Sequence, residues 1–338
     1  MKSNSKPNCL RRTLIVLAPC LVLAVGWVSC VSVKMPGRNF TGQLPSASSE
    51  QATIAENLET HIGKLAGEIG ARNVTRYEAL KKTESYLEKE LTKSGWKVRH
   101  QTFESRAKTV RNFDVELPGT TKPDEIVIVG AHYDTAYDSP GANDNTSGTA
   151  GLLELARLFA HTTNARTLRL ALFVNEEPPY FRTEEMGSRV YARKCKERDE
   201  NIVAMISLET IGYYTDARNS QKYPPPLSLI YPSTGDFIGF VGNPASSKLV
   251  KRCIKIFREA EDFPTEGIAA PGSLPGIGWS DHWSFWQEGY PAIMLTDTAP
   301  FRYPYYHKQQ DTPDKIDPDR IARIVTGMQK VVNDLLNR

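Results

Sequence analysis

Apolar and polar positions follow a helical period in the first part of the chain after residue 50. In residues 51–68 and 75–94, apolar side chains recur every three or four positions, as in helices that bury one face. Residues 96–106 have the composition of a strand. The pattern therefore predicts two amphipathic helices followed by a strand.

Strand-like and helix-like segments then alternate to the end of the chain. The run Glu125–Ala131 is apolar after its first residue, as in a central strand that is buried on both faces. Strand and helix in turn predict a single-domain α/β fold whose mostly parallel central sheet has helices on both faces. The stretches 213–240 and 261–280, rich in Tyr, Pro and Gly, are expected to be long loops. The remaining predicted elements are strands at 167–175, 202–209 and after Pro291, and helices at 147–161, 187–198, 245–261 and 317–337.

The first 33 residues have a different pattern, which predicts an export segment. Basic residues and no acid occupy positions 1–12, and Thr13–Val33 carries no charge. The segment fits a membrane anchor. It also fits a lipoprotein signal that is cleaved before a lipidated Cys30, because Val28-Ser29-Cys30 resembles a lipobox, although Trp27 stands where Leu or Ala is usual. In both cases we expect the rest of the chain outside the cytoplasm, either membrane-anchored or periplasmic or secreted.

Composition adds few constraints to this picture. Residues 34–50, rich in Pro, Gly and Ser, are expected to form a linker or an ordered arm before a domain at 51–338. Forty-two basic and 39 acidic residues give a net charge of +3 without a clustered basic face, so a nucleic-acid partner is not expected. Disulfides are permitted outside the cytoplasm, so Cys195 and Cys253 either pair or remain free thiols.

Side chains that bind metal ions follow successive predicted strands. In α/β sheets ligands bind beyond the carboxyl ends of the strands, so we expect these side chains to converge. Imidazole and carboxylate groups suit zinc when no thiolate is supplied, and carboxylates gathered at one place repel each other unless a cation compensates. The pattern predicts a site for two metal ions in which Asp144 bridges them. The five predicted ligands are His132, Asp144, Glu177, Glu209 and His307.

The order of the motifs points to a known family. His-x-Asp at residue 132, Gly-Ala-x-Asp-Asn-x-Ser-Gly at 141–148, Glu-Glu at 176 and Tyr-His at 306 together resemble the co-catalytic zinc aminopeptidases of metallopeptidase family 28. The resemblance covers about residues 75–338. It implies two zinc ions per chain, one held by His132, Asp144 and Glu209 and the other by Asp144, Glu177 and His307.

The same resemblance implies a function and further roles. The chain is expected to be a zinc-dependent exopeptidase, and most simply an aminopeptidase that hydrolyses N-terminal residues from peptides through a metal-bridging water. Glu176 would be the general base for that water, Asp134 would orient His132, and Tyr306 would donate a hydrogen bond to the developing oxyanion. The family often has a cis peptide after the bridging Asp, which here is the bond from Asp144 to Asn145.

One departure from the family pattern keeps an alternative open. The family commonly has Asp where this chain has Glu209, and glutaminyl cyclases, which resemble the family, work with a single zinc. An acyltransferase that cyclises N-terminal glutamine with one metal is therefore the first alternative. The second is a non-catalytic binding homologue, against which the intact Glu176 and the full ligand set argue.

Two further groups of residues are expected near the site. Ser280-Asp281-His282 matches a Ser-Asp-His segment of the family and is interpreted as a supporting loop in which His282 bonds a carboxylate. Several aromatic residues either line a substrate pocket or simply pack within loops: Tyr213, Tyr214, Phe237, Phe240, Tyr303 and Tyr305.

Overall fold

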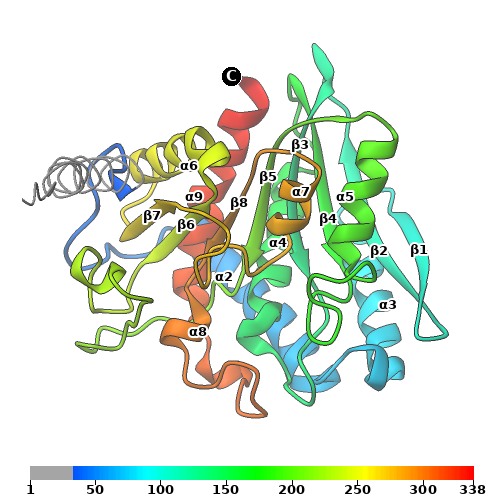
Figure 1. The fold of residues 1–338 in the computed structure, drawn as a ribbon, viewed down its shortest axis with the longest axis horizontal. Helices are drawn as coiled ribbons and strands as arrows, with labels where there is room; N and C mark the ends of the chain where they lie inside the picture. The colour runs from blue at the N-terminus through cyan, green and yellow to red at the C-terminus, as the bar shows by residue number, and fades with distance from the viewer. Residues whose placement is uncertain (1–32) are drawn as a thin grey trace, which may run out of the picture. The chain divides into compact units, whose positions relative to one another are not determined.

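A single eight-stranded sheet organises the computed structural model, which describes residues 33–338 (Figure 1). The central strands are parallel to one another, whereas β2 pairs antiparallel with β4, and β6 pairs antiparallel with β8. The predicted α/β fold with a mostly parallel sheet is confirmed. From edge to edge the strands are β1 (Arg99–Ser105), β2 (Lys108–Leu117), β4 (Arg166–Phe173), β3 (Lys122–His132), β5 (Asn201–Glu209), β8 (Ala292–Thr296), β6 (Ile238–Gly242) and β7 (Thr265–Ala269).

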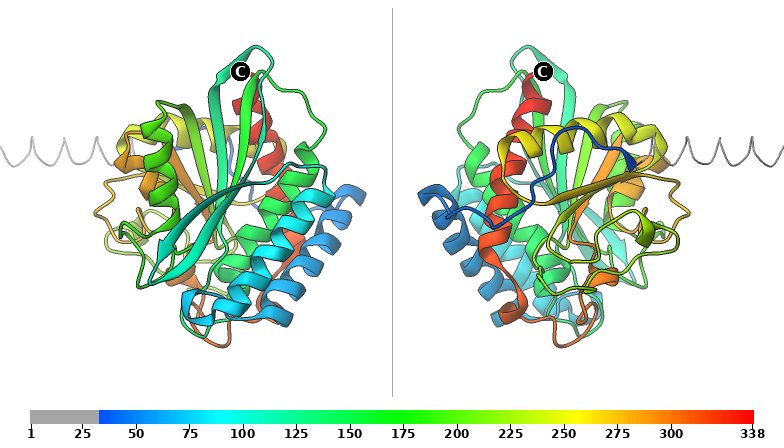
Figure 2. Two further views of the ribbon diagram at one scale, coloured as in Figure 1. Left: turned by 90° about the vertical axis from the view of Figure 1, so that its right-hand side faces the viewer. Right: turned by 90° about the vertical axis from the view of Figure 1, so that its left-hand side faces the viewer.

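Helices cover both faces of the sheet (Figure 2). The larger apolar core lies between the sheet and α2 (Ser49–Ile62), α3 (Tyr77–Lys93), α4 (Gly148–Phe159), α6 (Ser247–Ala260) and α9 (Pro318–Asn337). A smaller core on the opposite face packs α5 (Gly187–Glu197) and α7 (His282–Gln287) against the central strands. A short helix, α8 (Ala299–Arg302), follows β8.

Local sequence signals account for several element ends. Ser48 caps α2 by accepting a hydrogen bond from the N–H of Gln51, and the side-chain oxygen of Gln51 accepts one from the N–H of Ser48. Asp317 caps α9, with Pro318 at the first helical position. In β3, Ile126 to Val129 are all buried, because helices cover both sides of this strand.

The two predicted long loops are wrong in part, because strands form in both. β6 begins inside 213–240, at Ile238, and ends at Gly242, and β7 lies within 261–280. Both have five residues and contain glycine, so their sequence carries no clear alternation, and they form because they extend the sheet beyond β8. The antiparallel strand β2 was also not predicted.

The two cysteines of the described region do not pair. Cys195 and Cys253 are buried free thiols, one in the smaller core and the other in the larger core on the opposite face of the sheet. The sequence left open a disulfide or two free thiols, and the structure has two free thiols.

The segment before α2 contacts the sheet edge. The Asn39 side chain accepts a hydrogen bond from the N–H of Thr265 at 2.8 Å and donates one to Glu266 at 3.1 Å. Within residues 33–338, no helix combines the length and the apolar character that a bilayer span requires. The predicted anchor or lipoprotein signal, including Cys30, lies outside the described residues apart from Val33 and remains a prediction.

Candidate metal centre

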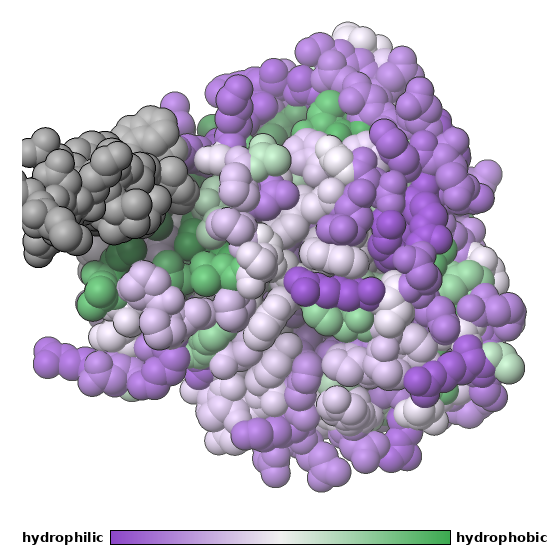
Figure 3. Space-filling view, viewed as in Figure 1, coloured by the Kyte–Doolittle hydropathy of each residue, from purple (hydrophilic) through white to green (hydrophobic). Residues whose placement is uncertain are grey.

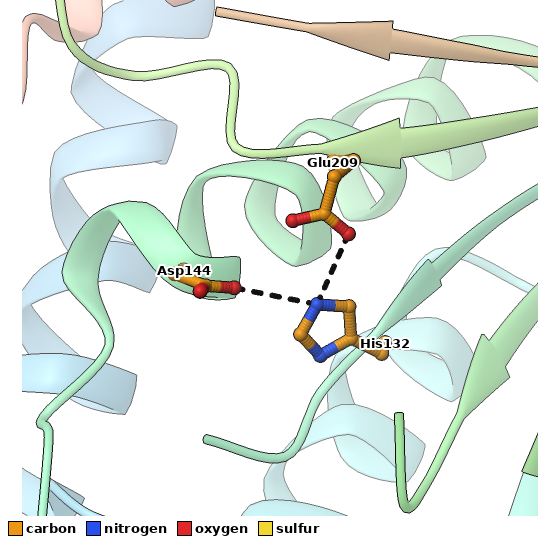
Figure 4. A group of neighbouring side chains, drawn as sticks. All are labelled: His132, Asp144 and Glu209. Carbon is orange, nitrogen blue, oxygen red and sulfur yellow. Dashed lines mark ion pairs between the residues drawn. The ribbon is translucent and has the colours of Figure 1, made fainter. Parts of the chain in front are cut away.

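His132 lies between two carboxylates at the carboxyl end of the central strands. It is the last residue of β3, and Glu209 is the last residue of the neighbouring β5. The His132 Nε2 atom lies 3.2 Å from Glu209 Oε2 and 3.4 Å from Oδ1 of Asp144, which precedes α4 (Figure 4). These three side chains are buried and form one potential three-ligand site.

Asp144 also belongs to a second group of three. Its other oxygen, Oδ2, lies 3.1 Å from His307 Nε2, and the same nitrogen lies 3.1 Å from Glu177 Oε2. The two oxygens of one carboxylate thus face two different imidazoles. The peptide bond between Asp144 and Asn145 is cis, as expected.

The chemistry of these side chains fits a pair of zinc ions. The structure leaves both Asp144 oxygens, both ring nitrogens of His132 and the Nε2 atom of His307 buried without a well-formed hydrogen bond among the described residues. Buried polar atoms normally have hydrogen-bond partners. Within each group of three residues, one potential ligand atom per residue lies within 4.8 Å of the other two, as in a metal site. Two imidazoles and three carboxylates form a donor set that zinc accepts.

Electrostatics argue for a cation at the same place. Burial, together with the neighbouring Asp144 carboxylate, raises the pKa of Glu177 to about 8. Burial also raises the pKa of Glu176 and of Glu209, with carboxylate neighbours acting in the same direction. A positive ion among these acids would favour their charged forms and relieve their mutual repulsion.

Asp134 supports the turn that carries Glu176 and Glu177. Its two oxygens accept hydrogen bonds from the backbone N–H of Glu176 at 3.1 Å and of Glu177 at 3.2 Å. Its distance from His132 Nδ1 is 3.5 Å, longer than a good hydrogen bond. Asp134 therefore lies beside His132 as expected, but its firm contacts are with the backbone of the Glu-Glu turn.

Glu176 and Tyr306 lie beside the two groups of three ligands that share Asp144, and Glu176 also forms a third potential group with His132 and Glu177. Glu176 is buried, and its Oε2 atom is 3.9 Å from His132 Nε2. The Tyr306 ring stacks on His307 at a centroid distance of 3.8 Å and lines a cleft together with Glu209. Both side chains are thus placed where a substrate bound at the centre would meet them.

Asp311 holds the Asp144 loop and was not predicted. Its buried carboxylate accepts hydrogen bonds from the N–H of Asn143 at 2.8 Å and of Asp144 at 3.1 Å, and from the Tyr303 hydroxyl at 2.8 Å. It lies four residues after His307 in a loop that contains several acids, so nothing in its spacing distinguishes it.

Arg72 is a second unpredicted support. Its fully buried guanidinium donates hydrogen bonds to the carbonyl oxygens of Tyr133 at 2.7 Å and Pro140 at 2.8 Å, and to the Thr146 hydroxyl at 2.7 Å. One side chain therefore ties both ends of the loop that runs between His132 and Asp144. A single Arg in a short irregular segment carries no sequence signal for such a role.

The Ser280 segment supports the site in a way different from the one expected. Ser280 donates a hydrogen bond to Glu209 Oε2 at 2.7 Å. The expectation that His282 bonds a carboxylate is wrong, because its Nε2 atom lies 2.8 Å from the carbonyl oxygen of Ile277. Burial lowers the pKa of His282 to about 4, so the ring stays neutral and donates to that carbonyl.

For the aromatic residues, the sequence left open whether each lines a pocket or packs within a loop, and the structure contains both cases. Phe237 lines the cleft beside the centre. Phe240 packs in the core against Phe257, and Tyr213 packs against Tyr303 with ring centroids 4.7 Å apart.

Sequence comparisons agree on one family. The family model described as peptidase family M28 matches residues 112–332. The chain is 34% identical over 323 residues to the uncharacterized protein YfbL of Escherichia coli K12, covering 93% of this chain and 94% of that protein. A probable zinc metalloprotease of the fungus Pyrenophora tritici-repentis is 27% identical over 230 residues, or 60% of this chain. The chain spans 44% of the length of that metalloprotease.

Solved structures share the fold. The aminopeptidase LapA of Legionella pneumophila superposes with a TM-score of 0.67 at 16% identity, covering 89% of this chain and 78% of that one. A glutaminyl cyclase of Fimbriiglobus ruber superposes with a TM-score of 0.61 at 19% identity, covering 89% of this chain and 99% of that one.

Proposed function

Because the chain belongs to peptidase family M28, a family of zinc peptidases, we propose that it is an aminopeptidase that removes N-terminal residues from peptides. The family resemblance read from its motifs is thereby confirmed. The observation that carries the proposal is the position of Asp144 between His132 and His307. The carboxylate of Glu176, which belongs to neither group that shares Asp144, lies beside them.

The described residues offer places for two zinc ions. His132, Asp144 and Glu209 would hold one, and Asp144, Glu177 and His307 would hold the other. When bound, zinc supplies an activated water and polarises the scissile carbonyl.

Glu176 moves the proton in this proposal. A carboxylate beside the reacting water takes its proton and passes it to the leaving amine, and this role requires a pKa closer to neutrality than that of an exposed Glu. Burial raises the pKa of Glu176 in this direction. Asp134 holds the backbone N–H of Glu176 and so fixes where its side chain starts. The Tyr306 hydroxyl donates to the oxygen on which negative charge develops.

A free amino terminus needs an acidic partner, which this centre could supply. Asp144, Glu177 and Glu209 would be held by the metal ions, whereas Glu176 lies beside them and could pair with an α-ammonium group. Such a pair would support an aminopeptidase over a carboxypeptidase.

The test is hydrolysis of a panel of aminoacyl amides and of matched N-acylated peptides, with and without a chelator. Hydrolysis of free N-termini that is lost on chelation and restored by Zn²⁺ would support the proposal. Activity only on blocked N-termini would contradict the aminopeptidase assignment. Cyclisation of N-terminal glutamine, with near one metal per chain, would favour the cyclase alternative, to which the longer Glu209 side chain points.

A further inference from the structure

A cleft extends from the metal centre over the uncovered part of the sheet. Its empty volume, counted out to open solvent, is about 780 Å³. Glu209 and Tyr306 border it at the centre, and its floor continues over β8, β6 and β7. Figure 3 shows hydrophobic surface gathered on the left of the molecule, in the region of β6, β7 and the loop before β6.

Strand register connects the metal centre to a second carboxylate. Glu209 pairs with Thr296 of β8, Thr296 with Gly239 of β6, and Gly239 with Glu266 of β7. Residues in one such row point to the same face of a sheet, and all four residues line the cleft. Gly239 has no side chain, so the floor between the two carboxylates stays low.

Among residues 33–338, Glu266 and Glu209 are the charged residues that line the cleft. Within this part of the chain, Glu266 accepts one hydrogen bond, from Asn39, and no basic nitrogen lies within 4.0 Å of it. The nearby Arg258 directs its guanidinium to the backbone oxygen and the hydroxyl of Thr265, both at 2.7 Å. A half-buried carboxylate without a counter-ion is costly in an apolar cleft unless a ligand supplies the cation.

Stacked aromatic pairs form walls of the cleft. Tyr223 and Tyr231 stack with ring centroids 5.7 Å apart, and the Tyr231 hydroxyl is fixed by a hydrogen bond to the Gly267 carbonyl at 2.7 Å. Trp279 and Phe301 stack at 6.2 Å. Such walls suit a methylene stem, which long basic side chains bury while their charged heads find a polar partner.

The dimensions match a long side chain. Three strand-to-strand steps of about 4.8 Å put the backbones of Glu209 and Glu266 roughly 14 Å apart, and their side chains leave the sheet on the same face, so the two carboxylates are separated by a similar distance. An extended lysine side chain covers roughly 6–7 Å and an ion pair about 3 Å, which leaves about 4–5 Å for the substrate's amino group beside Glu209. A leucine side chain is too short to reach the carboxylate.

We infer that Glu266 makes this cleft a specificity pocket for a basic N-terminal residue, lysine or arginine, whose stem lies along the aromatic walls and whose cationic head pairs with Glu266. The inference rests on the proposed aminopeptidase function, because it assigns the substrate side chain that this function acts on.

Binding of lysine amide and norleucine amide to the purified, metal-loaded protein tests the pocket without relying on turnover. Norleucine has a stem like that of lysine but ends in a methyl group. We expect lysine amide to bind at least about tenfold more tightly, since only its ammonium can pair with Glu266. Equal or tighter binding of norleucine amide would overturn the inference.

The variant Glu266→Gln retains the size of the side chain and removes its charge. It should lose the preference for lysine amide while it keeps its affinity for norleucine amide, which also reports that the pocket is still folded. The matched control Glu259→Gln, at an exposed acid on α6, should keep the wild-type preference. A preference for lysine that survives in Glu266→Gln would overturn the inference.

Hydrolysis assays with lysyl and norleucyl 4-nitroanilides separate the inference from the proposed function. If neither is hydrolysed but lysine amide still binds through Glu266, the aminopeptidase function fails and the pocket stands. If norleucyl is hydrolysed faster than lysyl, the function stands and the pocket assignment fails.

Discussion

Asp311 accepts a hydrogen bond from the backbone N–H of Asp144 at 3.1 Å, and this contact fixes the residue on which both halves of the metal centre depend. Because the backbone is held from behind, the Asp144 carboxylate can present one oxygen to His132 and the other to His307. Neither contact with the histidines would be kept if the loop rotated.

The substitution Asp311→Ala should therefore weaken metal binding. Supporting groups of this kind typically contribute about 10- to 100-fold in metal affinity, which competition with a chromogenic chelator measures. The exposed Asp314, three residues later, provides the control Asp314→Ala, which should bind zinc like the wild type. Unchanged affinity in Asp311→Ala would mean that the loop keeps its conformation without this contact.

The substitution Glu176→Gln should remove catalysis while it leaves the metal ions in place. The amide cannot accept the proton, and general-base catalysis is worth about 10²- to 10⁴-fold in kcat. Zinc content by elemental analysis should stay at the wild-type value, because Glu176 belongs to neither of the two groups that share Asp144. The exposed Glu197 on α5 provides the control Glu197→Gln. A variant that keeps wild-type turnover would remove Glu176 from the mechanism.

The substitution Ser280→Ala should affect one metal position more than the other. Ser280 donates a hydrogen bond to Glu209 but to no atom of Glu177 or His307. We expect about tenfold weaker binding of one of the two proposed zinc ions, seen as two separated steps in a zinc titration. The buried Ser284, which bonds Ser188 instead, provides the control Ser284→Ala. Equal weakening of both steps would contradict a role specific to Glu209.

The substitution Arg72→Met should destabilise the fold. It leaves the carbonyl groups of Tyr133 and Pro140 without their donor and removes a buried positive charge near the acid cluster. Each buried acceptor that is left without a donor costs about 1–3 kcal/mol in the free energy of unfolding, measured by denaturant titration. Arg76→Met, at an exposed ion pair with Asp138, should cost under about 1 kcal/mol. If Arg72→Met lowers the free energy of unfolding by as little as Arg76→Met does, water must replace the contacts of Arg72.

The preference for lysine over norleucine should increase with pH. Burial and the nearby Asp236 raise the pKa of Glu266 to about 7, although Arg258 and the hydrogen bond from Asn39 act to lower it. Tyr231 also lies near this carboxyl group. Below this pKa the carboxyl is neutral and cannot pair with an ammonium, so the affinity ratio should fall about tenfold from pH 8 to pH 6. In Glu266→Gln the ratio should not depend on pH. A wild-type ratio that is equally flat would exclude titration of Glu266.

The amino-acid sequence by itself determined the alternation of elements and identified the candidate ligand residues. Long segments such as Glu125–Ala131 and 317–337 have enough positions for their period to identify them, and motifs around His132 and Asp144 are local in the chain. Helix ends at Ser48 and Asp317 are likewise set by contacts within three residues.

Only the tertiary structure decided what lies between distant segments. The short strands β6 and β7 form because neighbouring strands satisfy their backbone groups, so their own residues do not predict them. Asp311 and Arg72 act on loops that are far from them in the chain, and Glu266 shares a cleft with Glu209 only through the register of four strands. These relationships depend on which residues become neighbours in space, and local pattern carries no information about that.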